Sequence, residues 1–580
     1  MKKQGDVSHA RGHYPALAQV TVLPTLGADP ITGYRTRAKL VVGGDGSLGL
    51  YEDGAEHVVL DIPGCRVLSP ALALVANAIR SHRKQGDATT TTAWRAVDLR
   101  EVDTPGSGAP RVLVTLVVER SKDLRLETLR DEARTLAREA PSVAGVSVNF
   151  HDGKSPRILG SETMHLVGET GAMDRLGGST QHATFGAFAQ AHRGQAAKVH
   201  DLVAHALLPP GHASRRHRVS VVDLYGGSGA IALALAERGA EVTLVESFGP
   251  AATRAQEAAA RQGLTLETIV AEAAPALATF VRQKRRFDAA VVNPPRRGID
   301  PVARQALARL APDVVAYVSC DPVTLARDLD HLARLGFATS ELQPLDMIPL
   351  TDHTETVAIL RRGDPPSPVV LLEDADVIAV AKAPHEPTTP QGEHATSLLA
   401  RVQRLPGFAE AAPIHRLDVG TSGAVFFARH PSKVHPWSQA LGAESAEKVY
   451  LALVRGETAE HGRVDRPLED GKRRLEATTL WKRITTLGGH SLLEVRPEEG
   501  RTHQIRRHLA AIHHPVLGDA RYGHTPSNRY FEEKHGLDRT FLHCQRIAIS
   551  HPKTGNPVVV QAPLAGDLEG VLERLREKDA

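Results

Sequence analysis

The sequence predicts an α/β domain with a doubly wound parallel sheet, preceded and followed by mixed α+β domains. A chain of 580 residues is too long for a single hydrophobic core. Between about residues 219 and 360, apolar strand-like runs alternate with helical segments, the pattern of parallel strands joined by crossover helices. On both sides of this region, short strand-like runs broken by turn residues indicate α+β architecture.

The first predicted domain covers residues 1–165. Its strand candidates include residues 38–42 and 111–119, which are separated by turn residues. The opening residues Met1–Asp6 lack the apolar core of a secretory signal, and no run of about 18 apolar residues occurs. We therefore expect neither a signal peptide nor a membrane span.

Composition narrows the function only slightly. A net charge of +3 is weak evidence for a nucleic-acid partner, because many balanced surfaces carry as much. Cys65, Cys320 and Cys544 lie too far apart in the sequence to suggest a disulfide framework. Their spacing favours a reducing, cytoplasmic environment.

The second predicted domain covers residues 166–362. A strand at 219–224 runs into the glycine-rich turn Asp223–Gly229, and a helix is expected over 230–238. Such a turn lets a ligand approach the backbone, and Glu246, which ends the next strand, can accept hydrogen bonds from ribose hydroxyls. These features predict a nucleotide or S-adenosylmethionine (SAM) site without separating NAD from SAM.

Three later motifs carry chemistry. Asn293–Gly298 follows one strand candidate, Ser319–Pro322 follows the next, and His353–Ala358 closes the domain. A cysteine thiolate can act as a nucleophile and a carboxylate as a base. Cys320 and Glu355 are residues of these two types.

Together these motifs resemble the RNA uracil-C5 methyltransferases, from about residue 34 to residue 360. The resemblance implies a Rossmann-like, SAM-dependent methyltransferase domain in which Cys320 is the nucleophile and Glu355 is the base. It also implies cofactor contacts from four residues, namely Gln190, Tyr225, Glu246 and Asn293. The run from Asn293 to Ile299 is similar to the RlmC-type branch that acts on 23S rRNA, although most relatives carry Asp in place of Asn293.

One departure from the family pattern affects the expected cofactors, and one alternative reaction stays open. Many members bind an iron–sulfur cluster through four N-terminal cysteines, but only Cys65 is present in this region, so we expect no cluster. Cytosine-C5 methylation is an alternative reaction, because uracil and cytosine enzymes both begin with the attack of a cysteine on C6 of the base. Cytosine enzymes usually carry Pro before the nucleophile, or a second Cys, so Ser319 before Cys320 favours uracil.

Residues 363–368 form the predicted linker. Three prolines within this Gly-Asp-Pro-Pro-Ser-Pro run oppose both helix and central strand. We expect such a linker to limit the surface that the two halves share and to let them act independently.

The third predicted domain covers residues 369–580, with short strands and one helix at about 504–512. His415-Arg416-Leu417-Asp418 is followed at once by Val419–Gly423, and the run Gly500–Arg506 comes later. Tyr450 lies in a strand-like run between these two motifs.

These motifs resemble the RluA-type pseudouridine synthases over about residues 369–563, and residues 508–523 are closer to the TruC-type tRNA enzymes. The resemblance implies that Asp418 acts at the ribose and that Arg506 pairs with it and keeps it ionised. It implies that Tyr450 stacks on the target base and that Arg416 helps to displace a stacked base.

The two resemblances predict a bifunctional RNA modification enzyme that methylates one uridine at C5 and isomerises another to pseudouridine. The expected partner is RNA, either 23S rRNA, tRNA or both, with no obligate protein partner and no membrane. An alternative is that only one half is catalytic and the other is an RNA-binding module. His513 and His514 lack surrounding Cys or carboxylate ligands, so no metal site is predicted.

Overall fold

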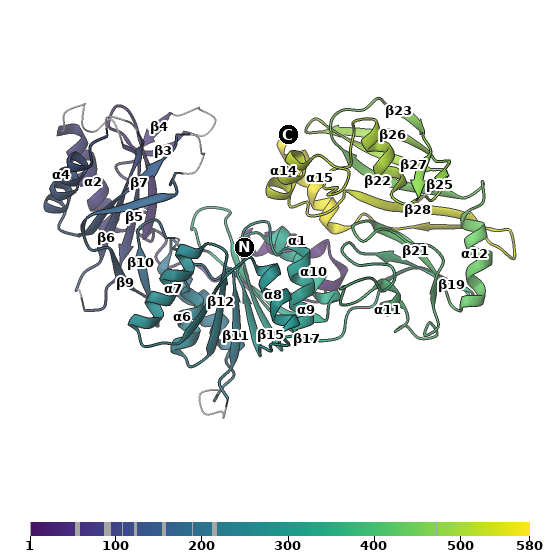
Figure 1. The fold of residues 1–580 in the computed structure, drawn as a ribbon, viewed down its shortest axis with the longest axis horizontal. Helices are drawn as coiled ribbons and strands as arrows, with labels where there is room; N and C mark the ends of the chain where they lie inside the picture. Colours follow the sequence, from purple (N-terminus) through teal and green to yellow (C-terminus); the bar gives the residue numbers. More distant parts are fainter. Residues whose placement is uncertain are drawn as a thin grey trace.

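The computed structural model describes residues 2–52, 58–85, 94–106, 108–120, 124–153, 158–187, 189–211, 217–470 and 473–579. Its three large sheets have seven, eight and ten strands, and they follow one another along the longest axis of the molecule (Figure 1). The fold class predicted from the sequence, an α/β domain between two α+β domains, is confirmed.

The N-terminal domain is a seven-stranded sheet in the order β4-β3-β2-β5-β6-β7-β8, with two helices packed against its buried face. Its apolar strands are buried on both faces at the centre, where β6 carries the run of Val and Leu that the sequence shows. The elements are β2 (Arg37–Val42), β3 (Leu48–Tyr51), β4 (Val59–Asp61), α2 (Pro70–Gln85), β5 (Trp94–Val102), β6 (Arg111–Glu119), α4 (Leu126–Glu139), β7 (Val143–His151) and β8 (Glu162–Gly168). A hairpin of β9 (Gly171–Leu176) and β10 (Ser179–Thr184) leads to the next domain.

The central domain is an eight-stranded sheet in the order β1-β16-β17-β15-β14-β11-β12-β13, with a hydrophobic core on each face. Strands β11 to β15 are parallel, and β17 runs antiparallel to β15. The elements are α1 (Lys2–Gly12), β1 (Thr21–Val22), α5 (Arg193–Leu207), β11 (Ser220–Leu224), α6 (Ala230–Glu237), β12 (Glu241–Glu246), α7 (Gly249–Arg261), β13 (Leu266–Val270), α8 (Ala273–Arg282), β14 (Ala289–Val292), α9 (Pro301–Leu310), β15 (Val314–Ser319), α10 (Pro322–Arg334), β16 (Phe337–Leu345) and β17 (Glu355–Arg362).

The predicted first domain, residues 1–165, needs one correction at its start, because the first residues of the chain fold with the central domain. Thr21 pairs with Glu341 at the edge of the eight-stranded sheet. Val7 and Leu17 are buried in the core beneath α10. A short helix with few apolar residues and a two-residue strand carry too little periodicity for sequence patterns to assign them.

The C-terminal domain is built on a ten-stranded sheet whose main order is β18-β19-β21-β28-β22-β27-β26-β23. The elements are β18 (Val369–Glu373), β19 (Val377–Lys382), α11 (Leu398–Val402), β20 (Ala412–Pro413), β21 (Ser422–Ala428), α12 (Val434–Leu441), β22 (Glu447–Val454), β23 (His461–Asp465), β24 (Leu468–Asp470), β25 (Arg473–Leu475), β26 (Thr478–Leu487), β27 (His490–Pro497), α13 (Gln504–Ala511), α14 (Thr525–His535), β28 (Leu542–Ser550), β29 (Pro557–Gln561) and α15 (Gly566–Asp579). Short 3₁₀ turns at Pro15–Leu17 and Pro431–Lys433 complete the described elements.

A buried ion-pair cluster joins the central and C-terminal domains, so the prediction of a small shared interface is wrong. Asp538 of the C-terminal domain accepts a hydrogen bond from Arg304 of α9 at 2.6 Å and lies 3.4 Å from Arg327 of α10. His385 contacts its other carboxylate oxygen at 3.0 Å. Residues 363–368 are irregular, as predicted, but an irregular connection does not prevent the surfaces it joins from packing together.

Among the residues described, no helix is both long and apolar enough to cross a membrane.

Candidate active sites

A pocket of about 820 Å³ opens at the carboxyl ends of the central parallel strands. β11 lies between β12 and β14, so the strand order reverses at this point, where open α/β sheets bind their ligands. All six residues singled out in this half line the pocket: Gln190, Tyr225, Glu246, Asn293, Cys320 and Glu355.

The glycine-rich turn after β11 is shaped for a ligand. Tyr225 and Gly227 have φ angles of 60° and 57°, so the chain turns sharply at the pocket wall. The backbone N–H of Gly227 donates to Glu246 Oε2 at 2.9 Å, and the N–H of Phe248 donates to Oε1 at 2.8 Å. The Glu246 carboxylate is thereby held at the end of β12, where it can meet ribose hydroxyls.

Cys320 and Glu355 come together because their strands are neighbours. Ser319, at the end of β15, pairs with Thr356 near the start of β17. Because the two strands are antiparallel, Cys320, which follows Ser319, faces Glu355, which precedes Thr356. Burial raises the pKa of Glu355 to about 7, against the opposing effect of Arg296. Burial, reinforced by Glu355, also raises the pKa of the Cys320 thiol.

The cysteine loop is fixed on its other side by the start of α10. Asp321 caps the helix, its carboxylate accepting from the N–H groups of Val323 at 3.1 Å and Thr324 at 2.9 Å. A capped helix end holds Cys320 in place without using its side chain.

A second pocket, of about 930 Å³, lies in the C-terminal domain. The four residues singled out in this half all line it: Arg416, Asp418, Tyr450 and Arg506. Arg416 is exposed at the rim. Tyr450 reaches the pocket from β22, and burial, with the help of Cys544, raises the pKa of its hydroxyl, so the ring carries no charge.

Arg506 is shared between two carboxylates. It donates to Asp418 from Nη1 at 3.0 Å, and to Asp519 from both Nε and Nη2 at 2.7 Å. Although burial raises the pKa of Asp519, the hydrogen bonds from Arg506 leave it below its usual value. The buried Asp519 therefore orients the guanidinium so that Nη1 points at Asp418.

Two buried cations hold the Asp418 loop from behind. Arg539 donates to the carbonyl of Gly420 at 3.0 Å and to Ser422 Oγ at 3.1 Å. Lys382 donates to the carbonyl of Val419 at 3.2 Å, and burial lowers its pKa to about 7 despite the opposing Glu386. These contacts fix the backbone on which Asp418 sits.

Sequence reasoning did not assign Asp519, Lys382 or Arg539. Asp519 lies in the run Gly518–Gly523, whose similarity to a family pattern was the available signal. Lys382 and Arg539 follow no motif, because a contact to a backbone carbonyl requires only that a cation be nearby in the fold.

Comparisons with known proteins match each half separately. A family model described as tRNA (uracil-5-)-methyltransferase matches residues 211–363, and one described as RNA pseudouridylate synthase matches residues 376–511. An uncharacterized RNA methyltransferase of Geobacter sulfurreducens is 33% identical over 362 residues, covering 60% of this chain and 69% of the relative.

Two further matches concern one half of the chain each. An uncharacterized RNA pseudouridine synthase of Chloroflexus aurantiacus is 37% identical over 204 residues, covering 33% of this chain and 63% of the relative. The solved tRNA (uracil-54, C5)-methyltransferase of Pyrococcus abyssi, in complex with S-adenosyl-L-homocysteine, aligns at 22% identity with a TM-score of 0.49, covering 62% of this chain and 81% of that one.

The fold and the two pockets define an enzyme that modifies RNA at two catalytic domains. The chain belongs to the RNA methyltransferase family, through a methyltransferase domain of the uracil-5 type, and carries an RNA pseudouridine synthase domain beside it. It is a bifunctional RNA modification enzyme, and its substrate is RNA.

Proposed function

We propose that the central pocket methylates C5 of a uridine through Cys320 and Glu355, and that the C-terminal pocket converts a uridine to pseudouridine through Asp418. What supports this most is the convergence of both sets of residues, which are scattered along the sequence, onto two separate pockets.

The central pocket fits SAM, the methyl donor of this family. Glu246 offers acceptors for ribose hydroxyls, Gln190 and Asn293 offer amides, and Tyr225 lies in the sharp turn where the backbone is open to a ligand. Bound SAM supplies an electrophilic methyl group.

Cys320 begins the reaction by losing its proton to solvent and adding to C6 of the uracil. The new Sγ–C6 bond pushes electrons onto C5, which becomes the nucleophile that takes the methyl group. Glu355 then removes the C5 proton, the C5–C6 double bond forms again and Sγ leaves. A carboxylate with a pKa of about 7 is a suitable base at neutral pH, since it is partly ionised and still basic.

In the other pocket, Asp418 acts at the ribose while Arg506 stabilises its negative charge. The N1–C1′ bond breaks, the uracil turns, and a C5–C1′ bond forms in its place. The C5 proton is lost and N1 gains one, so the product is an isomer. Tyr450 provides an uncharged ring beside the base, and the exposed Arg416 can displace the base from its stack.

The finer identity of the RNA is also a proposal. Residues 293–299 favour 23S rRNA as a substrate, and residues 508–523 favour tRNA. The three free cysteines and the RNA substrate support a cytoplasmic location. Uracil is favoured over cytosine by Ser319 before Cys320.

The proposal is tested with total RNA from cells in which the gene is deleted. Purified enzyme and SAM are added, and 5-methyluridine and pseudouridine are mapped by sequencing. We expect both modifications to appear at defined positions. Appearance of only one of them, or of 5-methylcytidine, contradicts the corresponding half of the proposal.

A further inference from the structure

The two pockets are connected by one loop that lines both of them. Asn293 to Arg297 line the methyltransferase pocket, and Pro301, a few residues further along, lines the synthase pocket. Fully extended, such a segment spans at most about 30 Å. This is the length of roughly nine stacked nucleotides of one RNA strand.

A third, smaller pocket of about 240 Å³ fills the space between them. One wall is the loop from Arg297 to Pro301, and the other is the synthase domain at Gly518, Ala520 and Glu532. Arg297 is shared with the methyltransferase pocket, whereas Gly518 and Ala520 are shared with the synthase pocket. The three hollows therefore adjoin one another in a row, and we refer to this row as the channel.

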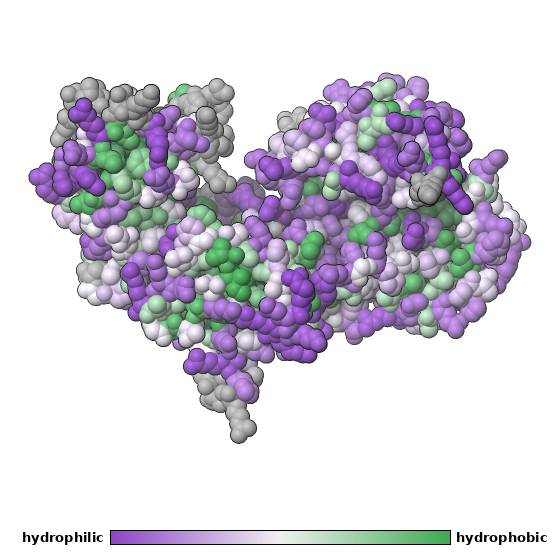
Figure 2. Space-filling model, viewed as in Figure 1, coloured by the Kyte–Doolittle hydropathy of each residue, from purple (hydrophilic) through white to green (hydrophobic). Residues whose placement is uncertain are grey.

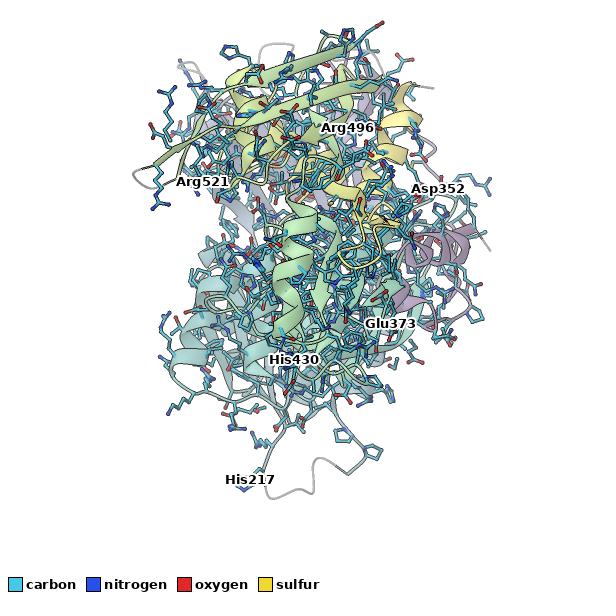
Figure 3. The ribbon with its side chains drawn as sticks, turned by 90° about the vertical axis from the view of Figure 1, so that its right-hand side faces the viewer. His217, Asp352, Glu373, His430, Arg496 and Arg521 are labelled. Carbon is cyan, nitrogen blue, oxygen red and sulfur yellow. The ribbon has the colours of Figure 1, made fainter. Side chains whose placement is uncertain are left out.

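The two ends of the channel carry positive charge that is free to meet phosphates, whereas its middle is lined by Asp300, Glu532 and Asp538 beside Arg297. Four exposed arginines line its ends: Arg296, Arg416, Arg501 and Arg521. Within the described part of the chain, none of the four forms an ion pair with a carboxylate. Arg521 lies at the outer edge of the synthase domain (Figure 3).

Arg297 marks the middle of the channel. It lies 3.8 Å from Glu532 on the opposite wall, and both side chains are exposed. Exposed ion pairs contribute little free energy, so a phosphate can replace Glu532 as the partner of Arg297.

The walls are held in a fixed relation by the buried cluster of Asp538, Arg304 and Arg327. On a larger scale, the N-terminal and C-terminal domains stand apart above the central one and leave a hollow between them (Figures 1 and 2). A rigid channel between two pockets suits a substrate long enough to reach both.

We infer that one RNA molecule occupies both pockets at once, with a segment of its backbone lying along the channel over Arg297. The inference rests on the proposed function of each pocket. It names the substrate as a single RNA that carries both target uridines, so of the two RNA classes that residues 293–299 and 508–523 favour, only one is the substrate of both pockets.

The first test is the mapping experiment above, read for whether both modifications occur in the same RNA species. Their occurrence in one species agrees with the inference. If both occur, but in two different RNA species, the inference is overturned while the proposed function stands. If either modification is missing, it is the proposed function that fails.

The second test traps the enzyme on its substrate. The RNA is built with 5-fluorouridine only at the methylated position, so that it stays bound covalently to Cys320. We expect the trapped RNA to be pseudouridylated at its other position, and added free RNA to be left unmodified. Pseudouridylation of the free RNA at the rate of untrapped enzyme overturns the inference.

The third test uses Arg297, which does not line the synthase pocket. Arg297→Glu and the milder Arg297→Gln are expected to lower kcat/KM for pseudouridylation of the full RNA about tenfold and threefold. Arg282→Glu, an exposed arginine at the end of α8, is the matched control and should change it less than twofold. Unchanged pseudouridylation in both Arg297 variants, with normal thermal unfolding, contradicts a path over this residue.

An independent observation points to a metal site between α1 and α15. The Nε2 atoms of His9 and His13 are 3.4 Å apart, and each lies 3.6 Å from Glu573 Oε2. Ligand atoms around a tetrahedral zinc ion lie about 3.3 Å from one another, given Zn–N distances of 2.0–2.1 Å. The three atoms thus form nearly one face of such a tetrahedron.

A neighbouring carboxylate supports this reading. Glu569 Oε2 lies 3.1 Å from Nδ1 of His13, the ring nitrogen that does not face the other two ligands. A carboxylate on the second nitrogen of a histidine fixes the tautomer in which Nε2 is free to bind a metal. Because His9 is exposed, an ion can enter from solvent.

We propose that His9, His13 and Glu573 bind a divalent transition metal such as Zn²⁺, with water as the fourth ligand. α1 packs against α10 of the methyltransferase domain, and α15 packs against both α10 and β26 of the synthase sheet. The metal ties the two domains together at a second place, away from Asp538. No motif marks this site, because Glu573 is remote in the chain from His9 and His13, which are only four residues apart.

Tag-free protein stripped with EDTA is titrated with Zn²⁺ by calorimetry and with Co²⁺ by visible absorption. We expect one site, the absorption of tetrahedral Co²⁺, and a higher thermal unfolding temperature with Zn²⁺. His9→Ala and Glu573→Gln should weaken binding at least tenfold, whereas His435→Ala, an exposed histidine on α12, should not. Absence of this site, or equal binding by His9→Ala and wild type, overturns the proposal.

Discussion

Arg506 donates to Asp418 from Nη1, while its Nε and Nη2 both donate to Asp519. The arginine is thus held in place by a buried residue and presented to an active-site one. Because their contacts differ, substitutions of Arg506, Asp519 and Asp418 are expected to have different effects on pseudouridylation.

Arg506→Met is expected to lower the pseudouridylation rate by several orders of magnitude and RNA affinity only modestly. The substitution removes the charge that faces Asp418, whereas a phosphate-binding arginine would contribute mostly to affinity and to its salt dependence. Single-turnover rates and RNA binding across a salt series separate the two roles. A normal rate at saturating enzyme would make Arg506 a backbone contact.

Asp519→Asn is expected to act through Arg506. The amide still accepts one hydrogen bond but carries no charge, so the guanidinium is less firmly oriented and kcat should fall about 10- to 100-fold. The KM should stay nearly constant, since Asp519 is buried and does not touch the RNA. A change in KM alone would contradict a positioning role.

Methylation should depend on pH through Glu355. Its pKa of about 7 means that the base is protonated and inactive below neutral pH, so the methylation rate should rise as the pH passes through about 7. The contribution of Glu355 to folding stability changes with pH in the opposite direction. Because the folded-state pKa is raised, the contribution of Glu355 to stability is full below the unfolded pKa and is lost as the pH rises through about 7.

Glu355→Gln should abolish this pH step and leave methylated RNA covalently bound to Cys320, since the C5 proton has no base to take it. Denaturing gels with unmodified RNA detect the adduct, and Glu355→Gln/Cys320→Ala is the control that must lack it. Product release at the wild-type rate would assign the base elsewhere.

Cys320→Ala and Asp418→Asn should separate the two activities. Cys320→Ala removes methylation and the covalent adduct with 5-fluorouracil RNA, and Asp418→Asn removes pseudouridine only. Each chemical step uses its own pocket, so the other activity should stay within about threefold, an allowance for the shared channel. An equal adduct in wild type and Cys320→Ala would refute the nucleophile assignment.

Asp538→Ala should destabilise the whole molecule, because it leaves Arg304 and Arg327 buried without this partner. Breaking a buried pair costs about 3–5 kcal/mol. Glu393→Ala removes an exposed partner of Arg309 and should cost less than about 1 kcal/mol. Calorimetry should show one unfolding transition in the wild type and two in Asp538→Ala, and a single unshifted transition would exclude this cluster as the joint.

Much of both candidate sites could be predicted because their residues follow strands within recognisable motifs. Cys320 and Asn293 come directly after β15 and β14, so their place at one edge of the sheet follows from strand order alone. The helix at about 504–512, which carries Arg506, was also expected, and it spans Gln504–Ala511.

The contacts that support the sites could not be predicted. Asp538 and Arg539 adjoin in sequence, yet one faces the methyltransferase domain and the other holds the Asp418 loop. Such roles depend on which surfaces meet in space, and no local pattern records them. The same reason hides α1, whose burial depends on α10, far away in the chain.

The pairing of Ser319 with Thr356 determines how the methyltransferase domain tolerates insertions and deletions. The distance between Cys320 and Glu355 is set by the hydrogen-bonded ladder of β15 and β17, and not by the number of residues between them. The connection through α10 and β16 can therefore change length without separating nucleophile and base. A slip of one residue along β17, in contrast, turns Glu355 to the opposite face of the sheet and leaves in place the pocket residues that follow the other strands, such as Cys320 and Asn293.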